Sequence, residues 1–163
     1  MICSNKKLCV NDNCQKCFNN SFASYEKSKY WSGNNAVNPR NITHKSSVKY
    51  IFDCHICLHH FLLSPGDSFR KWCPYCGKKK LCDDNNCKIC FDRSFASHEL
   101  AKYWSKDNKL NPRKVFKTSG NKFLFDCDCA HQYERELSNL KNAVCICQFC
   151  AKTKLCANKD CIS

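Results

Sequence analysis

Four cysteines at two short intervals carry the clearest chemistry in this sequence: Cys54-x2-Cys57 and Cys73-x2-Cys76. Each C-x2-C turn aims two sulfur atoms at one point. Two such pairs separated by about 15 residues are typical of a tetrahedral zinc site. We therefore predict that Cys54, Cys57, Cys73 and Cys76 bind one zinc ion.

The second half of the chain holds a less regular version of this site. Cys127-x-Cys129 stands in place of the first pair, and Cys147-x2-Cys150 supplies the second. Because a C-x-C turn leaves less room for tetrahedral geometry, Cys145 or His131 is an alternative for one ligand. We predict a second zinc ion on Cys127, Cys129, Cys147 and Cys150.

A second pattern, C-x4-C-x2-C, occurs twice, and we call each occurrence a knuckle: Cys9, Cys14 and Cys17, then Cys82, Cys87 and Cys90. Three thiolates need a fourth ligand to complete a tetrahedron. For the second knuckle we predict His98, with an ordinary surface histidine as the alternative. Tyr25 stands at the equivalent position of the first copy, so there we predict Cys3 as the fourth ligand.

Composition favours metal over disulfides. The chain has 18 cysteines among 163 residues, and the N-terminal residues include no apolar stretch of signal-peptide length. No segment approaches the roughly 18 apolar residues of a membrane span. We therefore expect an intracellular protein (in host cytoplasm, a viral factory or a virion, if viral) that is not secreted, has no membrane partner and binds about four zinc ions.

The sequence repeats at an offset of 73 residues. Between Cys3 and Cys54, 27 of 52 aligned positions are identical to residues 76–127. We predict zinc-binding repeats at 1–76 and 77–150, followed by the truncated start of a third repeat at 151–163. Cys156 and Cys161 in that third segment could stay metal-free, share a metal with Cys145 or another chain, or form a disulfide.

Each repeat is predicted to be a small metal-stabilised α+β unit with little regular structure. Ser21 and Ser94 are candidate N-caps of helices that run to about Trp31 and Trp104. Aromatic-rich strands are predicted at 48–53 and 122–126, and each leads straight into a cysteine. Their return partners are expected at 61–63 and after Tyr133, which makes two hairpins.

The two copies resemble zinc-ribbon, treble-clef modules that recur in proteins of giant DNA viruses and in some bacterial proteins. The second copy carries the likeness through Tyr103-Trp104-Ser105, Asn108, Asn111-Pro112-Arg113, Val115, Ser119, Phe125-x-Cys127, His131 and Cys147-x2-Cys150. The first carries it through Tyr30-Trp31, Asn38-Pro39-Arg40, Ser46, Phe52-x-Cys54-x2-Cys57-x-His59 and Trp72-Cys73-Pro74-Tyr75-Cys76. The resemblance implies tandem zinc-binding folds and a role near nucleic acid.

The charge balance also favours nucleic acid as a partner. Lysine and arginine number 27 against 14 acidic residues, a formal charge of +13, which four zinc-thiolate sites would lower to about +6. A surface of this sign attracts phosphates with weak sequence specificity. The predicted contacts are Lys6, Lys7, Lys29, Arg40, Lys49, Lys79, Lys80, Lys102, Arg113, Lys114, Lys117 and Lys122.

Two other functions fit less well. A structural or assembly protein of a virion or a multiprotein complex would also use metal-stapled repeats, with a protein partner docking at the truncated third repeat. A nuclease built on His59, His60 or His131 would need a metal with an open coordination position. Because these histidines follow cysteine turns that close the metal shell, we expect hairpin packing instead, and no enzyme activity or small-molecule substrate.

Overall fold

The computed structural model describes residues 7–128, 131–140, 147 and 149. The chain divides into two compact units, residues 1–80 (unit 1) and 81–163 (unit 2). The predicted third segment, 151–163, lies outside the described residues. Within the described part, no helix is both long enough and apolar enough to cross a membrane.

Each unit opens with a one-and-a-half-turn helix built into its knuckle: α1 (Gln15–Asn20) and α2 (Lys88–Arg93). The second cysteine of each knuckle, Cys14 or Cys87, is the N-cap residue. Ser21 ends α1, and its hydroxyl donates to the Phe18 carbonyl at 2.7 Å. The prediction that Ser21 and Ser94 start long helices by side-chain capping was therefore wrong.

The chain after Ser21 forms 3-10 turns rather than an α-helix. They are η1 (Phe22–Ser24) and η2 (Glu26–Tyr30) in unit 1, and η4 (Phe95–Ser97) and η5 (Glu99–Tyr103) in unit 2. The backbone N–H groups of Tyr25, Ser28 and Trp31 each bond the carbonyl three residues earlier. Phe22 contacts both Tyr25 and Trp31, with ring centroids 6.3 and 5.7 Å apart, so the three rings lie together.

The Asn-Pro-Arg sequences form a third kind of turn, η3 (Pro39–Asn41) and η6 (Pro112–Lys114). Asn38 caps η3, since its side-chain oxygen accepts from the Arg40 N–H at 2.8 Å. Asn111 does the same for Arg113 at 2.9 Å. Proline suits the first position of the turn because its φ is already helical and no N–H is needed there.

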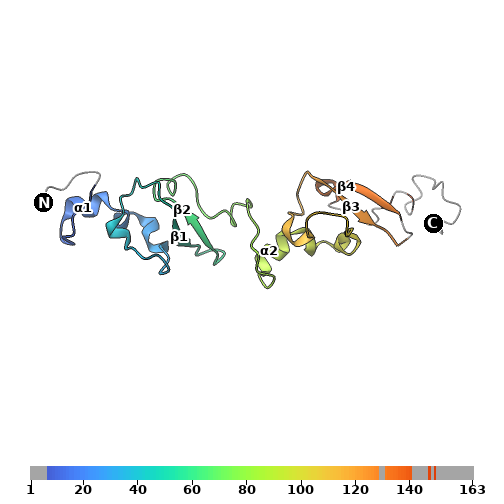
Figure 1. The fold of residues 1–163 in the computed structure, drawn as a ribbon, viewed down its shortest axis with the longest axis horizontal. Coiled ribbons are helices and arrows are strands. Elements are labelled where there is room, and N and C mark those ends of the chain that lie inside the picture. The colour runs from blue at the N-terminus through green and yellow to red at the C-terminus, as the bar shows by residue number, and fades with distance from the viewer. Residues whose placement is uncertain (1–6, 129–130, 141–146, 148, 150–163) are drawn as a thin grey trace. The chain divides into compact units, whose positions relative to one another are not determined.

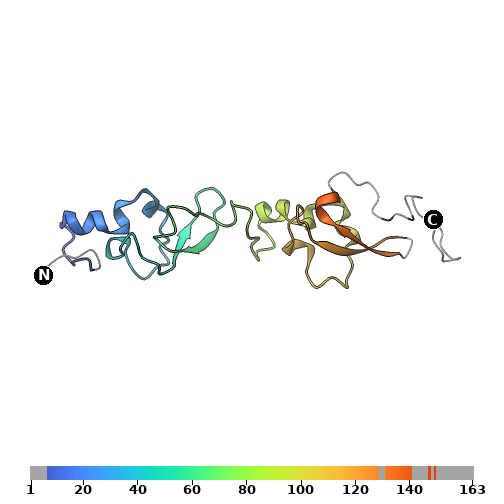
Figure 2. The same cartoon turned by 90° about the horizontal axis from the view of Figure 1, so that it is seen from above.

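Each unit contains one antiparallel hairpin, as predicted. In unit 1, β1 (Tyr50–Asp53) pairs with β2 (His60–Leu63), with Phe52 opposite Phe61. In unit 2, β3 (Lys122–Asp126) pairs with β4 (Gln132–Glu136), with Phe125 opposite Tyr133, and η7 (Leu137–Leu140) follows. Figures 1 and 2 show both pairs of strands. The two hairpins are confirmed.

An asparagine side chain binds the outer edge of the first strand in each hairpin. Asn35 accepts from the Ile51 N–H at 2.9 Å and donates to the Ile51 carbonyl at 2.7 Å. Asn108 makes the same two bonds to Leu124, at 2.9 and 2.7 Å. The amide thus substitutes for a neighbouring strand and fixes the loop that follows Trp31 or Trp104 against the hairpin.

Aromatic rings make up most of the core. In unit 1, Phe22 and Phe52 are fully buried with ring centroids 5.6 Å apart, and Trp31 lies 5.4 Å from Phe52. The core of unit 2 consists of Phe95, Leu100, Val115, Phe125, Leu137 and Leu140. These small cores bind the turns to one face of each hairpin and so position the cysteines at the hairpin ends.

Candidate metal centres

Unit 1 brings together the four cysteines of its predicted hairpin site, which we call the tetrad: Cys54, Cys57, Cys73 and Cys76. All four sulfurs lie within 4.8 Å of one another. The Sγ atoms of Cys54 and Cys76 are 3.5 Å apart, and those of Cys57 and Cys73 are 3.4 Å apart. The hairpin supplies the first pair directly after β1, and the second pair comes from the turn after Trp72.

These separations fit a shared metal ion. Thiolates about 2.3 Å from a tetrahedral centre lie roughly 3.8 Å from one another, close to the observed values. A disulfide would bring two sulfurs to about 2.05 Å. Three of the four cysteines are buried, so the site is closed to water on most sides. The tetrad is therefore positioned to bind a metal ion.

Backbone hydrogen bonds lower the pKa of one of these thiols and so favour the thiolate form that binds a metal. Burial alone would raise the pKa of Cys54, but the backbone N–H groups of Cys57 and Ile56 lower the pKa to about 7. Burial raises the pKa of Cys73 to about 11 and also raises the pKa of Cys76. A metal ion must therefore displace the protons of Cys73 and Cys76 at neutral pH.

Metal affinity is expected to fall steeply as pH falls. Since raised pKa values keep Cys73 and Cys76 protonated at pH 7–8, binding to the tetrad releases at least two protons. The apparent affinity should drop about 100-fold between pH 8 and pH 7. Competition with a chelator of known pH dependence measures this change. Release of fewer than two protons for the ion bound at the tetrad, in a weakly buffered solution, would contradict it.

The two knuckles have nearly the same geometry. The sulfurs of Cys9, Cys14 and Cys17 lie within 4.8 Å of one another, as do those of Cys82, Cys87 and Cys90. The first cysteine of each knuckle donates its backbone N–H to the sulfur of the third, at 3.2 Å in unit 1 and 3.4 Å in unit 2. Each knuckle is positioned to supply three ligands to one ion.

The structure gives His98 a different role from the predicted metal ligand. Its Nδ1 accepts a hydrogen bond from the Leu100 N–H at 3.2 Å, so it caps η5. The imidazole stacks on Phe95 with a centroid distance of 5.1 Å. Tyr25 occupies the same place in unit 1 and stacks on Phe22. His98 thus belongs to the aromatic packing, and Cys3 lies outside the described residues.

Part of the irregular hairpin site of unit 2 is described. Cys127, His131 and Cys147 place their ligand atoms within 4.8 Å of one another. His131 and Cys145 were the predicted alternative ligands, and this geometry brings His131 within reach of the same ion. Cys129, Cys145 and Cys150 lie outside the described residues, as do Cys156 and Cys161.

Two imidazole rings near the hairpins stack on aromatic rings. His59 stacks on Tyr75 at 4.1 Å, and His131 stacks on Phe149 at 4.3 Å. His60 bonds Asp53 across the strands at 2.6 Å, and Gln132 bonds Asp126 in the same way at 3.0 Å. Because glutamine makes the same cross-strand bond in unit 2, this contact needs no imidazole chemistry.

The predicted basic residues divide into two groups. The described lysines among them are all exposed: Lys7, Lys29, Lys49, Lys79, Lys80, Lys102, Lys114, Lys117 and Lys122. Lys6 lies outside the described residues. Arg40 and Arg113 are each only 8% exposed, so their prediction as phosphate contacts was wrong. Each guanidinium instead donates to a backbone carbonyl inside a knuckle.

Sequence reasoning missed this second role of the arginines, although a signal was present. Arg40 and Arg113 follow the same Asn-Pro pair, and each lies 29 residues after its hydrogen-bond partner, Asn11 or Asp84. The constant interval pointed to an internal contact. A count of charges could not reveal this contact, because it treats every arginine as part of the surface.

The comparisons connect the chain to a giant virus. No protein-family profile matches it. Over 167 aligned residues, 99% of the chain, it is 40% identical to the uncharacterized protein R635 of Acanthamoeba polyphaga mimivirus. The chain spans 41% of the length of that relative. The expected similarity to a giant-virus protein is confirmed.

Proposed function

We propose that the chain is a zinc-stabilised tandem-repeat module that binds nucleic acid through exposed lysines, with weak sequence specificity. The metal is zinc, because closed, four-thiolate tetrahedral sites are typical of structural zinc. Each unit has a treble-clef or zinc-ribbon architecture. Such a unit combines a knuckle, short helical turns and a hairpin, and it has little regular secondary structure. Bound zinc supplies free energy that such small cores lack.

One feature links the metal site to the proposed binding surface. Lys78, Lys79 and Lys80 are consecutive, exposed, and follow directly after the tetrad. The Lys78 N–H donates to the Tyr75 carbonyl at 3.2 Å, and the Lys79 N–H donates to the Pro74 carbonyl at 2.9 Å. The C-x2-C turn thereby fixes the backbone of Lys78 and Lys79 beside the tetrad, and the lysine segment begins there. We propose that this lysine segment binds phosphate groups.

Native mass spectrometry of the intact protein tests the metal assignment. About four zinc ions are expected: one in each knuckle and one in each hairpin site. Two ions would confine the metal to the hairpin sites, and a metal-free folded protein would refute the proposed architecture.

Removing charge from the lysine segment should weaken nucleic-acid binding. In the double variant Lys79→Gln/Lys80→Gln, the slope of log affinity against log salt should fall by about 0.7–0.9 for each phosphate that the protein no longer neutralises. The slope is measured by fluorescence anisotropy with labelled single- and double-stranded DNA and RNA, at salt concentrations from about 50 to about 200 mM.

Lys71→Gln is the matched control for this experiment. Lys71 is an exposed lysine of the same unit, and its ammonium group is paired with Asp67 at 3.3 Å. Its replacement should leave the salt slope unchanged. If the wild-type protein has no affinity for DNA or RNA at low salt, the proposal is refuted, and stoichiometric presence in virions would favour an assembly role.

A further inference from the structure

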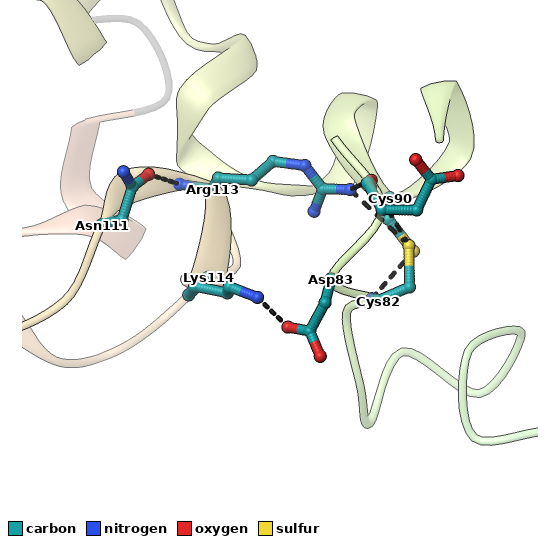
Figure 3. Close-up of polar contacts among 7 residues, drawn as sticks. Cys82, Asp83, Cys90, Asn111, Arg113 and Lys114 are labelled. Carbon is teal, nitrogen blue, oxygen red and sulfur yellow. Dashed lines mark hydrogen bonds and ion pairs between the residues drawn. The ribbon is translucent and has the colours of Figure 1, made fainter. Parts of the chain in front are cut away.

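Arg113 is a buried cation that points into the second knuckle. Its side chain is 8% exposed, and its Nη2 donates to the Asp84 carbonyl at 2.7 Å. The same nitrogen lies 3.6 Å from the Sγ of Cys82. Figure 3 shows the guanidinium of Arg113 reaching from η6 toward Cys82, and the neighbouring Lys114 pairing with Asp83.

Unit 1 repeats the burial and the contact to a backbone carbonyl with Arg40. This residue is also 8% exposed, and its Nη2 donates to the Asn11 carbonyl at 2.8 Å. In both knuckles the carbonyl that accepts from arginine also lies 3.7 Å from the sulfur of the first cysteine, Cys9 or Cys82. Two independent copies therefore place a guanidinium at the same point of the cysteine loop.

The burial of these cations needs an explanation. Among the described residues no carboxylate pairs with either guanidinium, and the Nε and Nη1 atoms of both are buried without a hydrogen-bond partner. An uncompensated buried charge costs several kcal/mol. Neutral thiols and one backbone carbonyl do not offset that cost.

A metal-loaded knuckle supplies the missing negative charge. Three thiolates around one divalent ion carry a net charge of about −1. The Cys82 sulfur then becomes an anionic acceptor for Arg113 Nη2, and charged hydrogen bonds are about twice as strong as neutral ones. The same contact ties the knuckle to η6, whose neighbour Val115 is part of the core of unit 2.

We propose that Arg113, and Arg40 in unit 1, are positioning residues that balance the charge of the metal-thiolate knuckle and connect it to the core. This inference rests on metal binding by the knuckles, as in the proposed function. Arginine suits the role because one planar guanidinium nitrogen, Nη2, can donate to both the carbonyl and the sulfur, and because the group stays charged when buried. Metal uptake in the knuckle and packing of the Asn-Pro-Arg turn then stabilise each other.

The test uses the full-length protein with Arg113→Gln, which removes the charge but keeps an amide donor. Zinc occupancy is measured by native mass spectrometry across a series of zinc buffers. One zinc ion should require a free zinc concentration about 10- to 100-fold higher than in the wild-type protein, the range for residues that support a ligand. The remaining ions should load as before. Lys117→Gln, an exposed charge-matched control in the same unit, should leave all occupancy curves unchanged.

A spectroscopic measurement separates charge balance from a purely structural role. In the cobalt-loaded protein at saturating metal, Arg113→Gln should shift the sulfur-to-metal charge-transfer band of the knuckle to lower energy. The shift is expected because the Cys82 sulfur loses its cationic donor. Difference spectra against Cys82→Ser identify the contribution of this knuckle. Arg113→Lys keeps the positive charge but lacks the guanidinium, so it should restore part of the zinc affinity. It also replaces the Arg113→Gln variant in the test if that protein does not fold.

The failures of the two proposals are distinguishable. If Cys82→Ser leaves the zinc count unchanged, the knuckle binds no metal, and the metal assignment fails together with this inference. If Cys82→Ser loses one zinc ion but Arg113→Gln and Arg113→Lys keep the wild-type occupancy curve and cobalt band, only the role of the arginine is refuted.

Discussion

Replacing Cys57 by serine is expected to release one zinc ion and unfold the hairpin of unit 1, while unit 2 stays folded. Cys57 is buried, and its sulfur lies 3.4 Å from that of Cys73. Structural zinc sites contribute about 10–16 kcal/mol at neutral pH, as much as the whole stability of a typical domain. Loss of one ligand removes much of that free energy, which a small aromatic core cannot replace.

Native mass spectrometry and amide NMR spectra together measure this outcome. One zinc ion should disappear, and the amide signals of β1 and β2 should collapse to the positions of unfolded chain while those of β3 and β4 remain. Ile56→Ser is the matched control, because Ile56 lies in the same turn but is 65% exposed and supplies no ligand. A Cys57→Ser protein that keeps its full zinc count would show that the tetrad is not a metal site.

Phe125→Ala should destabilise unit 2 by about 3–5 kcal/mol, even with metal at saturation. The Phe125 ring is fully buried, and its centroid lies 5.6 Å from both Phe95 and Trp104. Truncation removes the ring at which the turns and the hairpin meet. It also leaves a cavity that rigid backbone turns cannot close.

Denaturant unfolding in excess zinc, followed by the fluorescence of Trp104 in a variant without Trp31 and Trp72, measures the destabilisation. Leu110→Ala is the control within the same unit. Leu110 is 50% exposed, so its truncation should change the free energy of unfolding by no more than about 0.5 kcal/mol. Equal effects of the two substitutions would show that Phe125 is not at the centre of the core.

The hairpins and the tetrad could be predicted because their signals are local. The strand residues 50–53 are rich in aromatic residues and run directly into Cys54, so a single short segment specifies both the strand and the first ligand pair. The second pair has the same spacing, and tetrahedral geometry leaves few ways to combine two such turns.

The helix starting at Ser21 could not be predicted correctly from helical spacing alone. Phe22, Tyr25 and Trp31 are separated by multiples of three, which fits 3-10 turns better than a helix of 3.6 residues per turn. Tyr25 itself is extended, with φ of −98° and ψ of 143°, and this separates η1 from η2. A tertiary contact also marks the earlier end of α1, since the Phe22 N–H bonds the distant Ile42 carbonyl at 2.7 Å instead of continuing the helix.

The roles of the two arginines and of His98 could not be predicted from residue type alone either. Residue type predicted Arg113 as a surface charge and His98 as a ligand, but the fold gives each side chain a partner inside its unit. The partner of Arg113 is 29 residues away in sequence. His98 is held by Phe95 and Leu100, so its ring faces the aromatic core.

The asparagines that bind the strand edges have a consequence for solubility. A two-stranded hairpin exposes backbone donors and acceptors along its margins, and such margins recruit strands from other molecules into aggregates. The Asn35 amide occupies both the donor and the acceptor of Ile51, and the Asn108 amide does so at Leu124. In each unit the amide thereby blocks the addition of a strand from another molecule at that margin, and this protection does not depend on the surface charge.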